Sequence, residues 1–133
     1  MLKPALIITN VFLLFAMPAL AQDCNNTTIQ PELNKCAETE YMSADKKLNI
    51  VYNFYRNVLD ENGKKTLLTM QKQWLKFRDL ACEHEARDFM PMINAGAGPM
   101  VYAGCMRSLT EAQTKLIQGW LEREKQQSGI TRE

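Results

Sequence analysis

The stretch WLKFRDLACEHE, residues 74–85, can be interpreted in two opposite ways, as an active site or as a structural helix. It contains the only histidine, one of the four cysteines and three acidic residues. Cysteine, histidine and carboxylate side chains bind metals and carry nucleophilic catalysis. The same stretch also repeats its apolar positions every three or four residues, which is the period of an amphipathic helix. The spacing of the reactive residues decides between an active site and a structural helix.

Helical geometry argues against a reactive site in this stretch. Cys82 and His84 are two residues apart, so on a helix their side chains point about 200° away from each other. A zinc site needs about four converging ligands, and a thiol nucleophile needs its base within reach. We therefore predict no metal ligand and no catalytic residue here, and we expect His84 to be exposed. Acid–base catalysis needs a cleft, so Asp79, Glu83 and Glu85 are expected to lie on a solvated helix face.

The helical pattern extends in both directions from this stretch. It predicts a helix from about Lys64 to Phe89, and the same spacing predicts an earlier helix from Asn34 to about Leu59. Between them, DENG (60–63) supplies turn-forming residues. A short link between two long amphipathic helices indicates an antiparallel hairpin.

Residues 90–104, MPMINAGAGPMVYAG, interrupt the pattern. Their prolines and glycines disfavour a helix, so a third helix is expected to begin near Val101 or Cys105 and to reach Trp120. TEAQ (110–113) fits a capping box, which allows a kink or restart near Ser108. No segment alternates long enough to predict a strand. The fold class is all-α: a small antiparallel helical bundle of about three main helices, stapled by two disulfides.

The N-terminal segment has the pattern of a secretory signal peptide. Lys3 gives the positive start, Ala5–Met17 the apolar run, and residues 19–21 (ALA) a cleavage site. We predict removal of residues 1–21, which leaves a helical domain over residues 22–125 and a flexible polar tail over 126–133. The exported chain is expected to be periplasmic or secreted, soluble, and not lipid-anchored, because the cleavage site is not followed directly by a cysteine.

The charge balance narrows the class of partner. Without Lys3, the chain has 15 basic and 15 acidic residues, so its formal net charge is zero. A neutral domain has no electrostatic footprint for nucleic acid or for an anionic membrane. We expect a protein partner, and no membrane association after signal cleavage.

The cysteines are expected to form disulfides rather than reactive thiols. An exported chain meets an oxidising compartment, where four cysteines indicate two disulfides. Three pairings are possible. We favour Cys24–Cys36 with Cys82–Cys105, because each pair is local and closes a segment that is otherwise poorly held.

Some polar residues lie on the apolar stripes of the first two helices. If these stripes meet, Asp45 and Arg78 are expected to form an ion pair, tied in by Asn49 and Gln71, with Trp74 facing the first helix. Such networks fix helix register, so we predict a structural role. Loss of one member of a buried pair would cost about 3–5 kcal/mol.

A second group of candidate residues lies in the predicted loop over 90–104. Met90, Met92, Met100 and Tyr102 are apolar or aromatic, and flexible thioethers suit adaptable protein contacts. We interpret them as a partner-binding loop. The alternative is that these side chains fold back and cap the bundle.

Three segments together resemble the LprI-like lysozyme-inhibitor family. They are CAETEYMSADKKLNIVY (36–52), LLTMQKQWLKFRDLAC (67–82) and GCMRSLT (104–110), followed by Leu116. The resemblance implies a small exported helical domain with paired cysteines, whose named members inhibit lysozyme, and it carries over no catalytic residue and no cofactor. The chain departs from the family in two places. The best-known inhibitory type is a lipoprotein, and a family arginine often stands where this chain reads EAQTK (111–115).

Two functions follow from these observations. The first is a binding protein that inhibits a lysozyme-type cell-wall hydrolase by occluding its cleft with the 90–104 loop. In that case Glu83, Glu85 and Asp88 would meet a basic hydrolase. The second is an envelope structural or adaptor module with another protein partner and no effect on hydrolases.

Overall fold

The computed structural model describes residues 24, 26–89 and 96–129. Over these residues the chain forms three α-helices and no strand: α1 (Gln30–Val58), α2 (Glu61–Ala86) and α3 (Gly98–Gln127). The all-α prediction with three main helices is confirmed. The predicted signal peptide, Met90, Met92 and the last residues of the polar tail lie outside the described residues.

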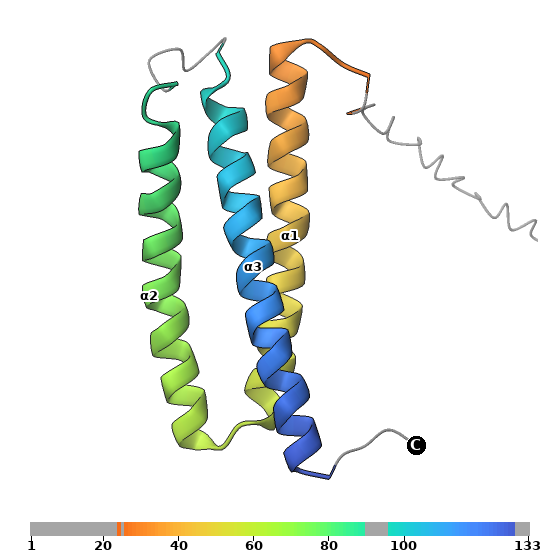
Figure 1. Cartoon of the computed structure of the whole chain (residues 1–133), viewed down its shortest axis with the longest axis vertical. Helices are drawn as coiled ribbons and strands as arrows, with labels where there is room; N and C mark the ends of the chain where they lie inside the picture. The colour runs from red at the N-terminus through yellow and green to blue at the C-terminus, as the bar shows by residue number, and fades with distance from the viewer. Residues whose placement is uncertain (1–23, 25, 90–95, 130–133) are drawn as a thin grey trace, which may run out of the picture.

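The three helices are arranged with α3 between α1 and α2 (Figure 1). α1 and α3 run in the same direction, and α2 runs in the opposite direction. α3 packs extensively on α1 and less extensively on α2, whereas α1 and α2 touch each other only slightly. The predicted antiparallel hairpin of α1 and α2 therefore exists as a chain path, but most of its packing passes through α3.

Two helices begin earlier than the sequence indicated, and proline is the reason. α1 starts at Gln30 instead of near Asn34, and α3 starts at Gly98 instead of near Val101 or Cys105. Each helix has a proline at its first or second position. A proline in the first turn costs little, because the missing N–H would have no partner inside the helix there. Counting prolines and glycines therefore overestimated the length of the loop.

α2 also begins before its predicted start, at Glu61, because the DENG turn is part of the helix. The carboxylate of Asp60 accepts a hydrogen bond from the backbone N–H of Gly63 at 2.7 Å, which caps the first turn. A Cβ on Gly63 would lie 3.1 Å from the same carboxylate oxygen, so a glycine fits this tight cap.

α3 continues without interruption past Ser108, where the sequence allowed a kink or restart. Thr110 is fully buried, and its hydroxyl accepts a hydrogen bond from Arg78 instead of capping a new helix. The capping-box motif was therefore misleading, because the threonine side chain is used between helices.

Both predicted disulfides are present, Cys24–Cys36 and Cys82–Cys105. The second joins the last turns of α2 to the second turn of α3 and is part of a buried cluster with Met106. α3 supplies the largest share of the core, as expected for the helix in the middle. Its buried residues are Gly98, Ala103, Cys105, Met106, Thr110, Gln113, Ile117 and Leu121.

None of the helices in the described part of the chain is both long enough and apolar enough to cross a membrane.

Candidate partner-binding groove

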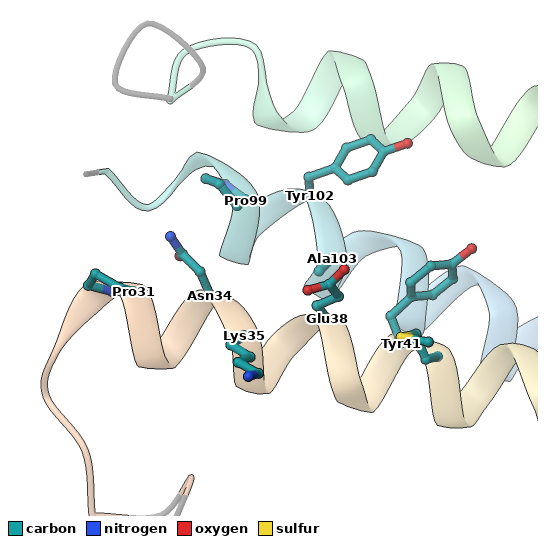
Figure 2. A pocket seen from close by; sticks show the side chains of 9 residues that line it. Pro31, Asn34, Lys35, Glu38, Tyr41, Pro99, Tyr102 and Ala103 are labelled. Carbon is teal, nitrogen blue, oxygen red and sulfur yellow. The ribbon is translucent and has the colours of Figure 1, made fainter. Parts of the chain in front are cut away.

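A groove of about 480 Å³ lies between the first half of α1 and the start of α3 (Figure 2). We call it the tyrosine groove, because the rings of Tyr41 from α1 and Tyr102 from α3 form part of its wall. Apolar side chains make most of the remaining surface, and Asn34, Lys35 and Glu38 supply its polar groups. The apolar lining consists of Pro31, Met42, Pro99 and Ala103.

One asparagine links the two sides of the groove. The side-chain amide of Asn34 donates to the backbone carbonyl of Gly96 at 3.2 Å and accepts from the amide of Gln30 at 2.9 Å. The first bond joins the start of α1 to the residues just before α3, and the second lies within α1. The width of the groove is therefore set by the chain itself, before any partner binds.

The two tyrosines combine a fixed ring with an available hydroxyl. Both rings pack against the buried cluster around the Cys82–Cys105 disulfide. Their hydroxyl ends point away from the helix starts at Pro31 and Pro99 (Figure 2). Within the described residues, neither hydroxyl makes a hydrogen bond. An aromatic ring with a free polar tip is well suited to a protein interface.

Burial and charge both act on these hydroxyls. Burial raises the pKa of Tyr102 above its usual value, and the carboxylates of Asp79 and Glu83 raise it further. Burial is also the main cause of the raised pKa of Tyr41, which the positive charge of Arg78 opposes. The tyrosines therefore stay protonated at neutral pH and act as hydrogen-bond donors as well as acceptors.

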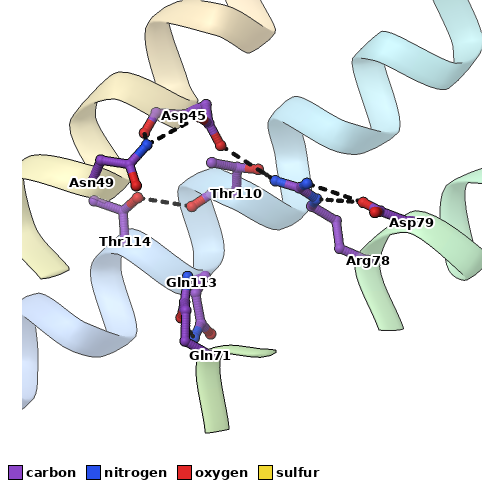
Figure 3. Close-up of polar contacts among 8 residues, drawn as sticks. All are labelled: Asp45, Asn49, Gln71, Arg78, Asp79, Thr110, Gln113 and Thr114. Atoms are coloured by element: carbon purple, nitrogen blue, oxygen red, sulfur yellow. Dashed lines mark hydrogen bonds and ion pairs between the residues drawn. The ribbon is translucent and has the colours of Figure 1, made fainter. Parts of the chain in front are cut away.

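Next to the groove, the buried side chain of Arg78 joins all three helices (Figure 3). Its guanidinium lies 3.4 Å from Asp45 on α1 and 3.0 Å from Asp79 on α2, and it donates to Thr110 on α3 at 3.4 Å. A single planar group thereby contacts partners on three elements, which an ammonium group would match less well.

The same guanidinium lies against two aromatic rings. Its central carbon is 5.6 Å from the centroid of the Tyr41 ring and 5.2 Å from that of Trp74. Distances below about 6 Å allow cation–π attraction. One side of the Tyr41 ring is therefore already in contact with a cation inside the protein.

Asn49 and Gln71, which were expected to join one network with Asp45 and Arg78, make separate hydrogen bonds. Asn49 donates to both the backbone carbonyl and the carboxylate of Asp45 at 3.0 Å. Gln71 instead accepts a hydrogen bond from Gln113 at 3.1 Å, in a separate contact between α2 and α3. Sequence reasoning missed Gln113 and Thr110, although both are polar residues on the apolar stripe of α3, which was the signal available.

Residues 98–104 of the predicted partner-binding loop are helical. Met100 and Tyr102 belong to the first turns of α3, and Met90 and Met92 lie outside the described residues. Met100 is half-buried and accepts a long contact from the amide of Gln30, at 3.9 Å to its sulfur. The prediction of a loop is therefore wrong from residue 98 onward, because proline and glycine are tolerated at the start of α3. The assignment of Met100 and Tyr102 to partner binding stays a prediction.

Two of the three acidic residues in residues 74–85 lie on the outside of the molecule, whereas Asp79 is half-buried beside Arg78. Glu83, His84 and Glu85 are exposed on α2, and His84 contacts the guanidinium of Arg87. Within the described residues, no three histidine, cysteine or acidic side chains are grouped so that they could hold a metal ion.

Comparison with known proteins places the chain in a family. Residues 22–116 match the family model described as lysozyme inhibitor LprI. An uncharacterized protein of Rhizobium meliloti (strain 1021) is 29% identical over 125 residues, which covers 79% of this chain and 86% of the relative. No solved structure matches the chain. Because the family match spans well over half of the sequence, the chain belongs to the LprI lysozyme-inhibitor family.

Proposed function

We propose that this chain is an exported binding protein that blocks a lysozyme-type cell-wall hydrolase by protein–protein contact. The observation that carries the proposal is the family match over residues 22–116. The two disulfides support export, because disulfides persist in oxidising compartments outside the cytosol. The family is one of inhibitors, so the expected activity is binding without turnover.

The tyrosine groove is the surface that we assign to this contact. Tyrosine and methionine are enriched in the buried centres of protein interfaces, and residues that fill pockets carry most of the binding energy. Tyr41, Tyr102 and Met42 line the groove, on helices that disulfide and amide contacts hold in place. A surface that is ordered before binding loses little conformational freedom when a partner docks.

Blocking a hydrolase and catalysing hydrolysis require different side chains in the groove. Hydrolysis of a glycosidic bond uses two carboxyl groups on either side of the bond. Among the residues that line the tyrosine groove, Glu38 is the one carboxylate, and Lys35 is the one cation. The groove therefore suits recognition of a side chain or loop better than bond cleavage.

The test of this proposal is a turbidity assay with lysozyme and a cell-wall substrate. A several-fold molar excess of the wild-type chain should slow the clearing of the suspension. The Tyr102→Ala variant should inhibit less, because it removes a groove wall. The Leu80→Ala variant should inhibit like wild type, because Leu80 is 65% exposed on α2 and does not line the groove. Unslowed clearing with wild-type protein would contradict the proposal for that hydrolase.

One further observation favours the adaptor function as a second candidate. Large apolar side chains are exposed away from the groove, with Phe54 and Phe77 each 60% exposed. Exposed apolar residues of this size can mark a protein-binding face. If a Phe77→Ser variant loses an envelope protein that wild type retains in a pull-down, and wild type leaves hydrolases unaffected, the adaptor function would be the better account.

A further inference from the structure

We infer that the tyrosine groove receives a basic side chain, arginine or lysine, from the partner protein. This inference rests on the proposed function only for the identity of the partner. The groove supports the inference through its ring faces, the unpaired carboxylates of Glu38 in its lining and Glu83 beside Tyr102, and its size.

The first support is that this end of the molecule already binds a cation on its rings. Arg78 lies 5.6 Å from the Tyr41 ring and 5.2 Å from the Trp74 ring. The faces of aromatic rings attract cations through their quadrupole. Tyr102 presents a second ring beside Tyr41 in the groove, and both hydroxyls point toward the same end of it (Figure 2). A basic side chain can therefore contact ring surface and hydroxyl oxygens together.

The second support is negative charge along the groove and beside the Tyr102 hydroxyl. Arg78 is paired with both Asp45 and Asp79, so these three groups together keep one negative charge. Glu38 lines the groove, and Glu83 lies close enough to act on the Tyr102 hydroxyl. Within the described residues, neither glutamate has an ion pair or a side-chain hydrogen bond. Two carboxylates are thus available to a cation from outside.

The opposing positive charges lie at the other end of the groove. The starts of α1 and α3 carry partial positive charge, but this effect fades within about the first turn of a helix. Tyr41 lies about three turns into α1, and Tyr102 lies just beyond the first turn of α3. Lys35 is the remaining cation in the groove. We therefore place the guest cation at the hydroxyl end, where Lys35 weakens but does not reverse the attraction.

The space available also fits. Binding pockets for small molecules have volumes of about 300–1,000 Å³, and a single long side chain needs less than a whole drug-sized ligand. At about 480 Å³, the groove has room for the aliphatic stem of an arginine or lysine against Met42 and Ala103. The stem would bury apolar surface while the charged head reaches the carboxylates.

The first experiment measures hydrolase binding by variants that change only charge. The double variant Glu38→Gln/Glu83→Gln should bind about tenfold more weakly than wild type. Both glutamates are exposed, so their replacement should leave folding intact. The Lys35→Gln variant should bind more tightly, a change of opposite sign that a structural defect would not produce.

A matched control removes the same charge elsewhere. Glu111 and Glu122 are exposed on α3, and Glu111 lies nine residues after Tyr102, on the opposite face of the helix. The double variant Glu111→Gln/Glu122→Gln should bind like wild type. Equal weakening by both double variants, or weakening by neither, would overturn the inference while leaving hydrolase inhibition standing.

The second experiment needs no hydrolase and separates the two proposals. The free, ¹⁵N-labelled chain is titrated with N-acetyl-arginine amide and, as the neutral analogue, with N-acetyl-citrulline amide. The arginine probe should shift the amide signals of Tyr41, Tyr102 and Ala103, and the citrulline probe should shift them much less. Glu38→Gln/Glu83→Gln should reduce the response. Equal responses to both probes, or no response, would overturn the inference even if the hydrolase is inhibited. A chain that inhibits no hydrolase but gives the predicted shifts would lose the proposed function and keep the groove assignment.

Discussion

At the scale of single residues, Arg78 is the side chain with the most varied contacts. Its side chain is 7% exposed, whereas the side chains of Asp45 and Asp79 are 38% and 49% exposed. The arginine is therefore enclosed, but both of its carboxylate partners still reach water. This asymmetry changes the cost of losing each member, because a partly hydrated carboxylate loses little when its partner is removed.

We predict that Arg78→Ala lowers the free energy of unfolding by about 3 kcal/mol, through loss of a buried, hydrogen-bonded side chain and the space it leaves. Asp45→Asn should cost only about 1 kcal/mol, because Asp79 remains as a partner and Asp45 is partly exposed. Urea unfolding followed by circular dichroism measures both. Arg78→Lys is the control that keeps the charge but loses the planar guanidinium. Its loss of unfolding free energy should lie between the losses of Arg78→Ala and Asp45→Asn. Equal losses for Arg78→Ala and Asp45→Asn would contradict this account.

The residues around Arg78 also show which contacts an apolar stripe in the sequence can predict and which it cannot. Asp45 and Arg78 were identified because both are charged residues on apolar stripes. Thr110 and Asp79 were not identified as partners of Arg78, although both contact it. Periodicity tells which face of a helix is buried, but not which residue of a third helix lies opposite. That information depends on how far each helix is shifted along its neighbour.

At the scale of elements, the connection from α2 to α3 is held by the Cys82–Cys105 disulfide. The bond closes a loop with a sequence separation of 23 residues. The cross-link limits the unfolded chain, and the loop-closure model gives about 3 kcal/mol of stabilisation for a loop of this size. It also fixes the cluster on which the rings of Tyr41 and Tyr102 pack.

We predict that this disulfide alone contributes about 3 kcal/mol to stability. The Cys24→Ala/Cys36→Ala variant retains only the Cys82–Cys105 bond, so its oxidised and reduced forms have the same sequence and differ in that bond alone. Urea unfolding of the two forms gives the difference directly. The reduced form should also inhibit the hydrolase less, because the walls of the groove lose their support. Superimposable unfolding curves would show that packing, and not the cross-link, holds α3 in place.

The ends of the helices were the least predictable part of the elements. Pro99 counted against a helix in residues 90–104, although it lies in the first turn of α3, just as Pro31 lies in the first turn of α1. The same residue type breaks a helix interior and suits a helix start, so its meaning depends on a boundary that the pattern does not mark sharply. The disulfide pairs were predicted correctly because short separations along the chain kept both partners near each other.

At the scale of the whole molecule, several tyrosines link stability to alkaline pH. Burial raises the pKa of Tyr41, Tyr55 and Tyr102 above the usual value of 10.0. Above that value the unfolded chain loses phenolic protons that the folded chain still holds. The stabilising contribution is therefore complete below about pH 10 and is lost as pH rises through the folded pKa values.

We predict that the free energy of unfolding falls between about pH 9 and pH 11 by more in the wild type than in a Tyr41→Phe/Tyr55→Phe/Tyr102→Phe variant. All other side chains are the same in the two proteins, so the difference between the two curves isolates the tyrosines. Urea unfolding at each pH, with brief exposure to protect the disulfides, provides the measurement. Parallel curves would show that these hydroxyls are as hydrated in the folded chain as in the unfolded one.

The number of helices and the direction of α1 and α2 followed from the sequence, but the position of α3 did not. Two amphipathic helices with a short link indicate an antiparallel pair, and nothing in their stripes indicates that a third helix separates most of their length. The tyrosine groove depends on that position, because Tyr102 and Ala103 come from α3. It could not be predicted before the packing of α1 on α3 was known.

The central position of α3 has a consequence for folding during protein synthesis. Ribosomes release a chain from its N-terminus, so α1 and α2 emerge first, yet they touch each other only slightly. The helix on which both pack, α3, is the last of the three to be made. Newly made α1 and α2 therefore lack most of their packing surface until α3 has followed them. The core of the bundle can form only after all three helices have been synthesised, so the helices are not added to a finished core one at a time.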